Sequence, residues 1–298
     1  MKQFLLFAVL CTSLSSFAYM RVVETVKVNL INPAAIAYSS LDQAFYISNI
    51  NGVNNRKNNS GFISRLHFNE KKAINEVIIS GGDEGITLDA PKGIVFDQGY
   101  LYVADIDTVR IFKRGLVGWE SFKNIKIYQA NFLNRLIIDK QKNLWVSDTG
   151  SNNIIKIAPP YGSSHPDIYF DQVVNTPVGL AFDPKDSDVI WVTSFSTSFI
   201  YKMSISRNEI IKKYQTRAIT LGGITFNDDN QILATHHDKG KVVSFSITDK
   251  VVTRTPINKV KLKSPNGVFY ESGSKLILVT DRISGELLMF QESIEIPK

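Results

Sequence analysis

Residues 90–97 read Ala-Pro-Lys-Gly-Ile-Val-Phe-Asp, and close copies occur as Thr-Pro-Val-Gly-Leu-Ala-Phe-Asp at 176–183 and Ser-Pro-Asn-Gly-Val-Phe-Tyr at 264–270. Looser copies begin at residues 32, 132 and 220. The second residues of the six copies lie at positions 33, 91, 133, 177, 221 and 265, at intervals of 58, 42, 44, 44 and 44. Internal repeats of this length indicate a propeller or a solenoid.

Short apolar runs follow each copy of this repeated segment. The copy at 132–139, for example, is followed by Leu144 to Asp148 and then by Asn153 to Ile157. These runs are rich in β-branched and aromatic residues and are bounded by Gly, Asn, Asp or Pro, which is typical of strands. Three such strands and a more variable fourth make one blade, so the sequence predicts an all-β, six-bladed β-propeller.

Two segments depart from the regular repeat. A strand expected from Arg21 to Asn29 precedes the first copy, and we predict that it pairs into the last blade, which otherwise lacks a fourth strand. The long first interval contains residues 51–60, which include five Asn and one Gly and are expected to form a polar loop. Residues 19–298 are expected to form a single propeller domain.

The first 18 residues have the pattern of a secretory signal peptide. Lys2 precedes an apolar run from Phe4 to Leu10, and Ser16 and Ala18 are the small residues that signal peptidase reads, so we expect cleavage after Ala18. A lipoprotein signal at Cys11 is disfavoured because Leu10 occupies a position that requires a small residue. The sequence therefore predicts a secreted or periplasmic protein.

Composition narrows the function further. Of 298 residues, 34 are Lys or Arg and 28 are Asp or Glu, a net charge of +6, and Cys11 is the single cysteine. A disulfide framework or a cysteine-ligated metal is therefore excluded. No apolar run is long enough to span a membrane, and no basic cluster with interleaved aromatics predicts nucleic-acid binding. We expect a monomer.

The repeated Pro-x-Gly segment, together with Val146 to Ile154 (Val-Ser-Asp-Thr-Gly-Ser-Asn-Asn-Ile), resembles NHL-repeat propellers. The six-copy layout is similar to the gluconolactonase/senescence-marker-protein/luciferin-regenerating-enzyme-like family. This resemblance covers residues 21–296 and implies the fold more than an activity, because such propellers include lactonases, lyases, synthases and binding modules.

The resemblance also implies a site. In that family a divalent cation is held by residues at the variable position of the Pro-x-Gly segment: Glu in the first blade, Asn in the third, Asn in the fourth, and Asp, which is also the general base, in the fifth. Here these positions are Ala34, Asn134, Val178 and Gly222, so only Asn134 matches. The sequence therefore favours neither the metal nor its lactonase mechanism, and no cofactor is expected.

Four residues near the expected channel are candidate ligand-binding groups: Lys92, Asn134, Arg135 and Asn266. This cationic, hydrogen-bonding set would suit a small anionic or polyhydroxylated ligand. The alternative is that Lys92 points to solvent and the two Asn residues satisfy turn backbone.

The residues that end the second strands are expected near the same face. Asp105, Asp148 and Asp281 are interpreted as turn-forming residues that accept backbone N–H bonds. His236 takes the place of these Asp residues in the fifth blade, and His237 follows it. His236 and Asp148 are the two catalytic candidates, and both are weak.

Three functions remain open. The leading hypothesis is an exported binding or scaffold module whose central pocket derives from a lactonase-type site that has lost its metal ligands. The second is a lactone or ester hydrolase with a rearranged site that uses His236 or Asp148. The third is an NHL-type protein-interaction module of the cell envelope, which would use its exposed faces and the Asn-rich loop.

Overall fold

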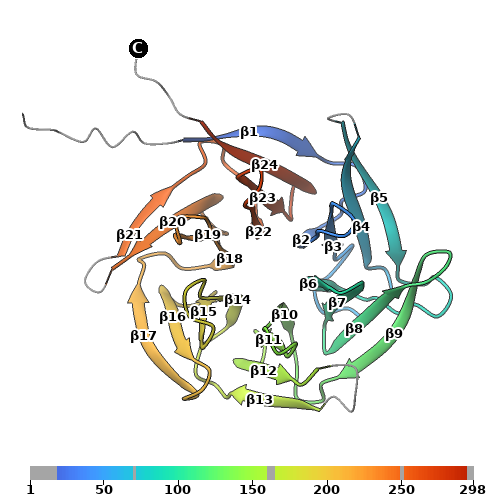
Figure 1. Ribbon diagram of the computed structural model, residues 1–298, viewed down its shortest axis with the longest axis horizontal. Coiled ribbons are helices and arrows are strands. Elements are labelled where there is room, and N and C mark those ends of the chain that lie inside the picture. Colours follow the sequence, from blue (N-terminus) through green and yellow to red (C-terminus); the bar gives the residue numbers. More distant parts are fainter. Residues whose placement is uncertain (1–18, 70–71, 160–164, 249–251, 294–298) are drawn as a thin grey trace, which may run out of the picture.

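The computed structural model describes residues 19–69, 72–159, 165–248 and 252–293. These residues form six four-stranded antiparallel sheets arranged as blades around a central axis (Figure 1). The expected all-β, six-bladed propeller is therefore confirmed. The predicted signal peptide, residues 1–18, lies outside the described residues.

Each blade contributes one strand to each of four concentric positions. The inner strands are β2 (Pro33–Ser39), β6 (Pro91–Asp97), β10 (Leu133–Ile138), β14 (Pro177–Phe182), β18 (Leu221–Phe226) and β22 (Pro265–Glu271). The second strands are β3 (Ala44–Asn49), β7 (Tyr100–Asp105), β11 (Leu144–Asp148), β15 (Val189–Ser194), β19 (Ile232–His236) and β23 (Leu276–Asp281). The six repeated segments thus become the six inner strands.

The two remaining positions lie farther from the axis. The third strands are β4 (Phe62–Asn69), β8 (Thr108–Arg114), β12 (Asn153–Ile157), β16 (Phe199–Ser204), β20 (Lys241–Ile247) and β24 (Glu286–Ser293). The outer strands are β5 (Lys72–Ser80), β9 (Trp119–Lys126), β13 (Pro166–Phe170), β17 (Glu209–Gln215), β21 (Val252–Pro256) and β1 (Tyr19–Val26). We number the blades 1 to 6 from β2, so that blade 6 contains β22, β23, β24 and β1.

The N-terminal strand closes the ring as predicted. β1 pairs antiparallel with β24, from Tyr19 opposite Ser293 to Val26 opposite Leu287. The strand ends at Val26, three residues before the Asn29 expected from the sequence. The last blade therefore combines both ends of the described chain (Figure 1).

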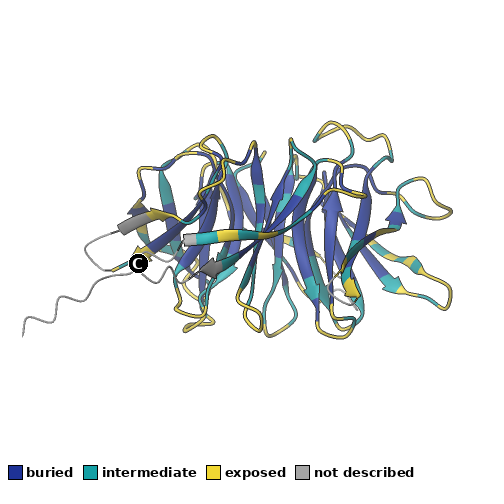
Figure 2. Cartoon of the chain, turned by 90° about the horizontal axis from the view of Figure 1, so that it is seen from above, coloured by how far each residue is buried: buried dark blue, intermediate teal, exposed yellow. Residues whose placement is uncertain are grey.

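Apolar side chains fill the spaces between blades. Trp145 of blade 3 packs with Leu180 and Ile190 of blade 4, and comparable clusters lie between the other neighbouring blades. In β3, β11, β15 and β19 every residue is buried, and in β7 and β23 every residue but the first. This burial explains why the first part of each second strand is apolar, and why the polar residues at its end have hydrogen-bond partners. Exposed residues concentrate on the loops at the two ends of the disc (Figure 2).

The repeated segment forms a β-bulge in each inner strand. The pairing between β14 and β15 shifts between Pro177 and Leu180, and the other five blades shift at the same place. Gly179 lies in this bulge, where a Cβ atom would come within 2.6 Å of the Gly222 carbonyl oxygen in the next blade. The glycine therefore allows two inner strands to approach closely near the axis.

Hydroxyl groups on the second strands connect neighbouring inner strands. In blade 4, Thr193 accepts a 2.8 Å hydrogen bond from the Gly179 N–H and donates a 2.6 Å bond to the Gly222 carbonyl of blade 5. Ser48, Ser147, Thr235 and Thr280 likewise donate to a carbonyl of the following blade. The Thr280 bond reaches Ala34 of blade 1 and so crosses the point of ring closure. Blade 2 has Ala104 at this position.

We predict that replacing Thr193 by Val, which has the same shape, lowers the free energy of unfolding by about 1–3 kcal/mol because the Gly179 N–H and the Gly222 carbonyl lose a buried partner. Urea unfolding measures the difference. Thr255→Val on the outer strand β21, where the side chain is exposed, is the matched control and should change stability by less than about 0.5 kcal/mol. Equal effects of the two substitutions would contradict a role for the hydroxyl in joining blades.

Candidate functional site

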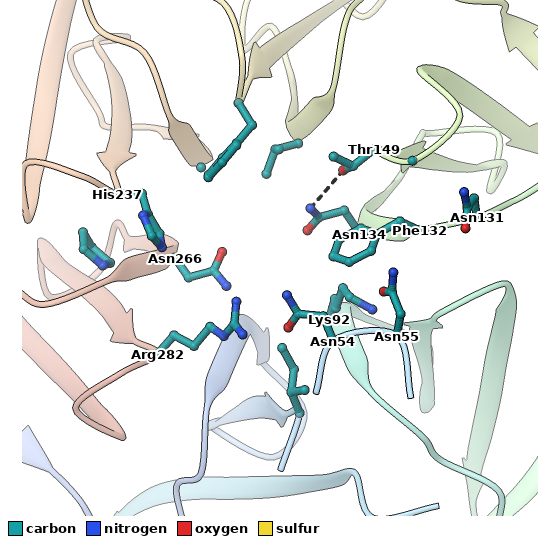
Figure 3. Close-up of a pocket in the computed structure, with 16 residues that line it drawn as sticks. Asn54, Asn55, Lys92, Asn131, Phe132, Asn134, Thr149, His237, Asn266 and Arg282 are labelled. Atoms are coloured by element: carbon teal, nitrogen blue, oxygen red, sulfur yellow. Dashed lines mark hydrogen bonds between the residues drawn. The ribbon is translucent and has the colours of Figure 1, made fainter. Parts of the chain in front are cut away.

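A cavity of about 350 Å³ opens at the end of the axis where the inner strands begin. Polar side chains from several blades converge on it, among them Lys92, Asn134, Asn266 and Arg282 (Figure 3). Its volume is in the range of small-molecule sites, roughly 300–1,000 Å³. This cavity, which we call the upper cavity, is the candidate functional site.

The variable residue of each repeated segment supplies the inner ring of the upper cavity. Five of the six variable positions line it: Lys92, Asn134, Val178, Gly222 and Asn266. They face the axis because the β-bulge lies at this position in every inner strand. The sixth, Ala34, instead joins a buried apolar cluster with Ile50, Ala90 and Ile106.

A second ring comes from the residues that immediately follow the second strands. Its members are Ile50, Thr149, Phe195, His237 and Arg282. Backbone bonds hold them at the cavity mouth: the N–H of Thr149 donates to Phe132, that of Phe195 to Thr176, and that of Arg282 to Ser264, at 2.9–3.0 Å. The residues predicted near this face are the strand-final ones, one position earlier, so Ile50, Thr149 and Arg282 were not among the candidates.

The strand-final residues have structural partners. Asp148 is fully buried and accepts bonds from the backbone N–H groups of Asn131, Phe132 and Gly150 at 2.8–3.2 Å. Asp105 and Asp281 accept equivalent bonds from the segments that lead into their own inner strands. These carboxylates hold the loops that shape the upper cavity, and none of them lines it.

His236 also lies away from the upper cavity. It is 4% exposed and stands in register with Leu221 and Lys241 within blade 5. Its neighbour His237 lines the cavity instead. Because successive residues of a strand point to opposite sides, a shift of one position decides which histidine reaches the site.

Lys92 is buried inside the upper cavity wall. Only 3% of the residue is exposed, its Nζ donates a 3.2 Å bond to the Ala90 carbonyl, and it lies 4.3 Å from the centre of the Phe132 ring. Burial lowers the pKa of Lys92 to about 8; the charge of Asp105 opposes this shift and that of Arg282 adds to it. Lys92 therefore does not point into bulk solvent.

The other ligand-binding candidates divide between two places. Asn134 lines the upper cavity and donates a 3.0 Å bond to the Thr149 hydroxyl (Figure 3). Arg135, the next residue, is 8% exposed and lines a different hollow at the opposite end of the axis. Its Nη2 donates a 3.0 Å bond to Asn266 Oδ1, so Arg135 reaches the floor of the upper cavity without lining it.

The electrostatic character of the upper cavity is positive. Lys92 and Arg282 both line it, and neither forms an ion pair within the described ranges. Partial burial lowers the pKa of Arg282, which stays charged near neutral pH. Among the residues that the structure describes, no Asp or Glu lines the cavity. An anion would therefore find positive charge there that no ion pair neutralises.

The Asn-rich loop between β3 and β4 has the polar, irregular form expected from its sequence. Asn54 and Asn55 extend from it to the cavity mouth (Figure 3). The buried Asn54 Oδ1 atom has no hydrogen-bond partner. A ligand hydroxyl would give this oxygen the donor it lacks. The loop is thus part of the site as well as an exposed surface.

His237 belongs to a short chain of polar side chains. Its Nε2 lies 2.7 Å from Ser264 Oγ, and its Nδ1 lies 3.2 Å from Asp238 Oδ1. A serine, a histidine and an aspartate in this order resemble a nucleophile with its base. Ser264, however, is 1% exposed and does not line the cavity, so its hydroxyl does not face a substrate there. These contacts orient the His237 ring, and each of its two nitrogens has a polar partner, Ser264 or Asp238.

The donors present do not fit the divalent cation of the resembled enzyme family. Of the four corresponding positions, only Asn134 carries a side-chain oxygen, and Lys92 and Arg282 place positive charge beside it. A hard cation needs several converging oxygens, preferably carboxylates. Elsewhere in the described ranges, no three His, Cys, Asp or Glu residues group as metal ligands.

No known family model and no curated protein matches this sequence. Solved structures do match it. The aldose sugar dehydrogenase of Streptomyces coelicolor, solved with PQQ bound, has 12% identity and a TM-score of 0.68, over 93% of this chain and 99% of that chain. A gluconolactonase of Xanthomonas campestris has 12% identity and a TM-score of 0.65, over 92% and 95%.

A third match is a catalytically inactive form of virginiamycin B lyase from Staphylococcus aureus, solved with quinupristin. It has 14% identity and a TM-score of 0.61, over 91% of this chain and 99% of that chain. These identities support the fold alone. The six-bladed architecture expected from the resemblance to gluconolactonase-like propellers is thereby confirmed.

We predict that Asp148→Ala lowers the free energy of unfolding by about 2–4 kcal/mol, because three backbone N–H groups lose an ionised acceptor. Urea unfolding measures this loss, and Asp148→Asn should lose less because one acceptor oxygen remains. Asp167→Ala, on the exposed outer strand β13, is the control and should be near neutral. An Asp148→Ala protein of unchanged stability would show that the carboxylate has no structural role.

Proposed function

We propose that this protein is a binding module for a small organic anion that carries several hydroxyl groups, such as a sugar acid. The observation that carries the proposal is the upper cavity, where two cationic side chains and several amides converge and none of the described lining residues is a carboxylate. Lys92 and Arg282 provide charge-assisted bonds to the anionic group. The amides of Asn54, Asn134 and Asn266 provide donors and acceptors for hydroxyls.

The size and the walls of the cavity fit this ligand class. A water molecule takes up about 30 Å³ in the liquid, so the upper cavity, at about 350 Å³, has room for on the order of a dozen groups of that size. Phe132 and Phe195 add flat apolar surfaces against which the C–H face of a sugar packs. Two of the matching structures are named as an aldose sugar dehydrogenase and a gluconolactonase, proteins whose names refer to sugar-derived substrates.

We favour binding over hydrolysis on the chemistry of the side chains. The donor set does not suit a divalent cation, and Ser264 is enclosed away from the cavity. His236 and Asp148, the catalytic candidates from the sequence, do not line the cavity either. We therefore infer that the pocket derives from a lactonase-type site. The variable positions of the inner strands still line it, but the metal ligands at these positions have been replaced by other residues.

We place this binding module outside the cytoplasm, either secreted or in the periplasm, from the signal-peptide pattern of residues 1–18. In the described part of the chain, no helix has the length and apolarity needed to cross a membrane. An NHL-type role in binding an envelope protein remains a second use of the same fold. We assign the Asn-rich loop to the ligand site first because Asn54 and Asn55 line the upper cavity.

We predict that D-gluconate binds in the upper cavity and that Lys92→Gln and Arg282→Gln each weaken this binding about tenfold or more, because each removes one charge-assisted bond. Isothermal titration calorimetry at pH 7 measures the affinity. D-glucose, which has the hydroxyls without the carboxylate, should bind more weakly than gluconate.

Lys140→Gln is the matched control for both variants. Lys140 is exposed in the turn between β10 and β11, at the other end of blade 3, and its replacement should leave gluconate affinity unchanged. If gluconate binds equally well to all four proteins, the upper cavity is not its site. If the purified protein instead hydrolyses glucono-lactone with saturable turnover, the hydrolase hypothesis replaces the binding module.

The affinity for gluconate should also depend on pH. The pKa of Lys92 lies at about 8 in the ligand-free protein, so its positive charge is present below that pH and is lost above it. A bound anion raises this pKa, and affinity should therefore fall about tenfold between pH 7 and pH 10. Calorimetry across this range measures the fall. Lys92→Gln should bind weakly but with a flat profile, and an unaltered pH dependence in that variant would contradict the role of Lys92.

A further inference from the structure

The propeller axis has a second hollow at the end opposite the upper cavity. This lower cavity has a volume of about 270 Å³ and is lined by residues of all six inner strands. Its walls are mainly apolar and include Val95, Phe96, Leu180, Val268 and Phe269. Several of these residues are half-buried, which is the exposure expected at the mouth of an apolar funnel.

Arg135 is the charged residue of the lower cavity, where all the other lining residues are uncharged. It extends from β10 in blade 3 to Asn266 on β22 in blade 6, and these two blades face one another across the axis (Figure 1). Asn266 lines the upper cavity and Arg135 lines the lower one. The 3.0 Å bond between them therefore lies between the two cavities.

The guanidinium group of Arg135 has a nitrogen without a hydrogen-bond partner. Its Nη1 atom is buried without a hydrogen-bond partner, and in the described ranges Arg135 makes no ion pair. Burial lowers the pKa of Arg135 to about 10, and no carboxylate in the described part of the chain opposes this shift. An unpaired buried charge is costly, and a bound anion would offset much of that cost.

The position of Arg135 in the repeat is unusual. The residue that follows the variable position is Gly in blades 2, 4, 5 and 6 and Ala35 in blade 1. The ring therefore accommodates a very small side chain here, and the fold does not require an arginine. A long cation at this position, on an apolar axis, suggests a role in binding.

We propose that the lower cavity binds a monocarboxylate with a short apolar tail, such as a medium-chain fatty acid. Its carboxylate would pair with the guanidinium of Arg135, and its tail would lie against the inner-strand side chains that form the walls. At about 30 Å³ for each water-sized group, 270 Å³ holds on the order of nine such groups. Octanoate therefore matches the volume. This site is separate from the upper cavity and does not depend on its proposed ligand.

Octanoate is the probe that tests this proposal, with octan-1-ol as the neutral molecule of the same tail and sodium chloride as the simple anion. Binding is measured by calorimetry and by the shift in melting temperature. We expect saturable octanoate binding that raises the melting temperature by several degrees, and about tenfold weaker binding of octan-1-ol.

Two variants locate the binding. Arg135→Ala copies the residue found in blade 1, so it is compatible with the ring, and it should abolish the octanoate response while keeping or raising the stability of the ligand-free protein. Ala181→Phe narrows the lower cavity, which Ala181 lines, and should weaken octanoate binding without changing gluconate affinity. Lys92→Gln in the upper cavity should leave octanoate binding intact.

Three results would overturn the proposal. Octanoate binding that survives Arg135→Ala would show that the carboxylate is not held by Arg135. Loss of octanoate binding in Lys92→Gln, with Arg135→Ala unaffected, would place the ligand in the upper cavity. If sodium chloride raises the melting temperature as much as octanoate does, and Arg135→Ala abolishes both rises, the site binds simple anions and the apolar tail plays no part.

Discussion

The hydrogen bond from a second-strand hydroxyl to the inner strand of the next blade is the interaction on which this propeller depends. Thr193 and its counterparts bridge two inner strands at the bulge, where the backbone departs from regular pairing and leaves polar groups to be satisfied. Apolar clusters between the blades supply most of the buried surface, but such contacts are not directional. In blades 1, 3, 4, 5 and 6 these hydroxyl bonds help to set the spacing of neighbouring inner strands, and that spacing brings the variable residues of different blades to one cavity.

The axis of the molecule is cationic and is divided into two environments. On one side of the bond between Arg135 and Asn266, amides and charged groups line a polar cavity, and on the other side aromatic and aliphatic side chains line an apolar one. The carboxylates nearest the upper end, such as Asp148, are occupied by backbone N–H groups. Among the described residues, the cations on the axis form no ion pair, and on this ground we propose an anion as the ligand and not a metal ion.

The sequence was sufficient to predict the fold because the repeat is local. Its period, the apolar runs and the leftover N-terminal strand are visible without knowledge of distant contacts, and all three appear in the ring. The variable positions Lys92, Asn134 and Asn266 were also identified, because each repeated segment enters the axis in the same way. Arg282 was not predicted, and His236 was preferred to His237, because the exact end of the strand decides which of two successive side chains faces the cavity. The direction of Arg135 depends on a partner in the opposite blade, which no local pattern reveals.

The pairing of β1 with β24 has a consequence for how the chain folds. Tyr19 lies opposite Ser293, so β1, the first of the described strands in chain order, has β24, the last of them, as its partner. Blades 1 to 5 are each continuous in sequence and can assemble as the chain emerges. Blade 6 forms only after both β1 and the segment β22 to β24 have been synthesised. Loop closure over such a separation is entropically unfavourable and slow compared with local pairing. The edge strands of a nascent ring therefore stay unpaired until β24 has been synthesised, and until then the chain is most exposed to pairing with another copy of itself.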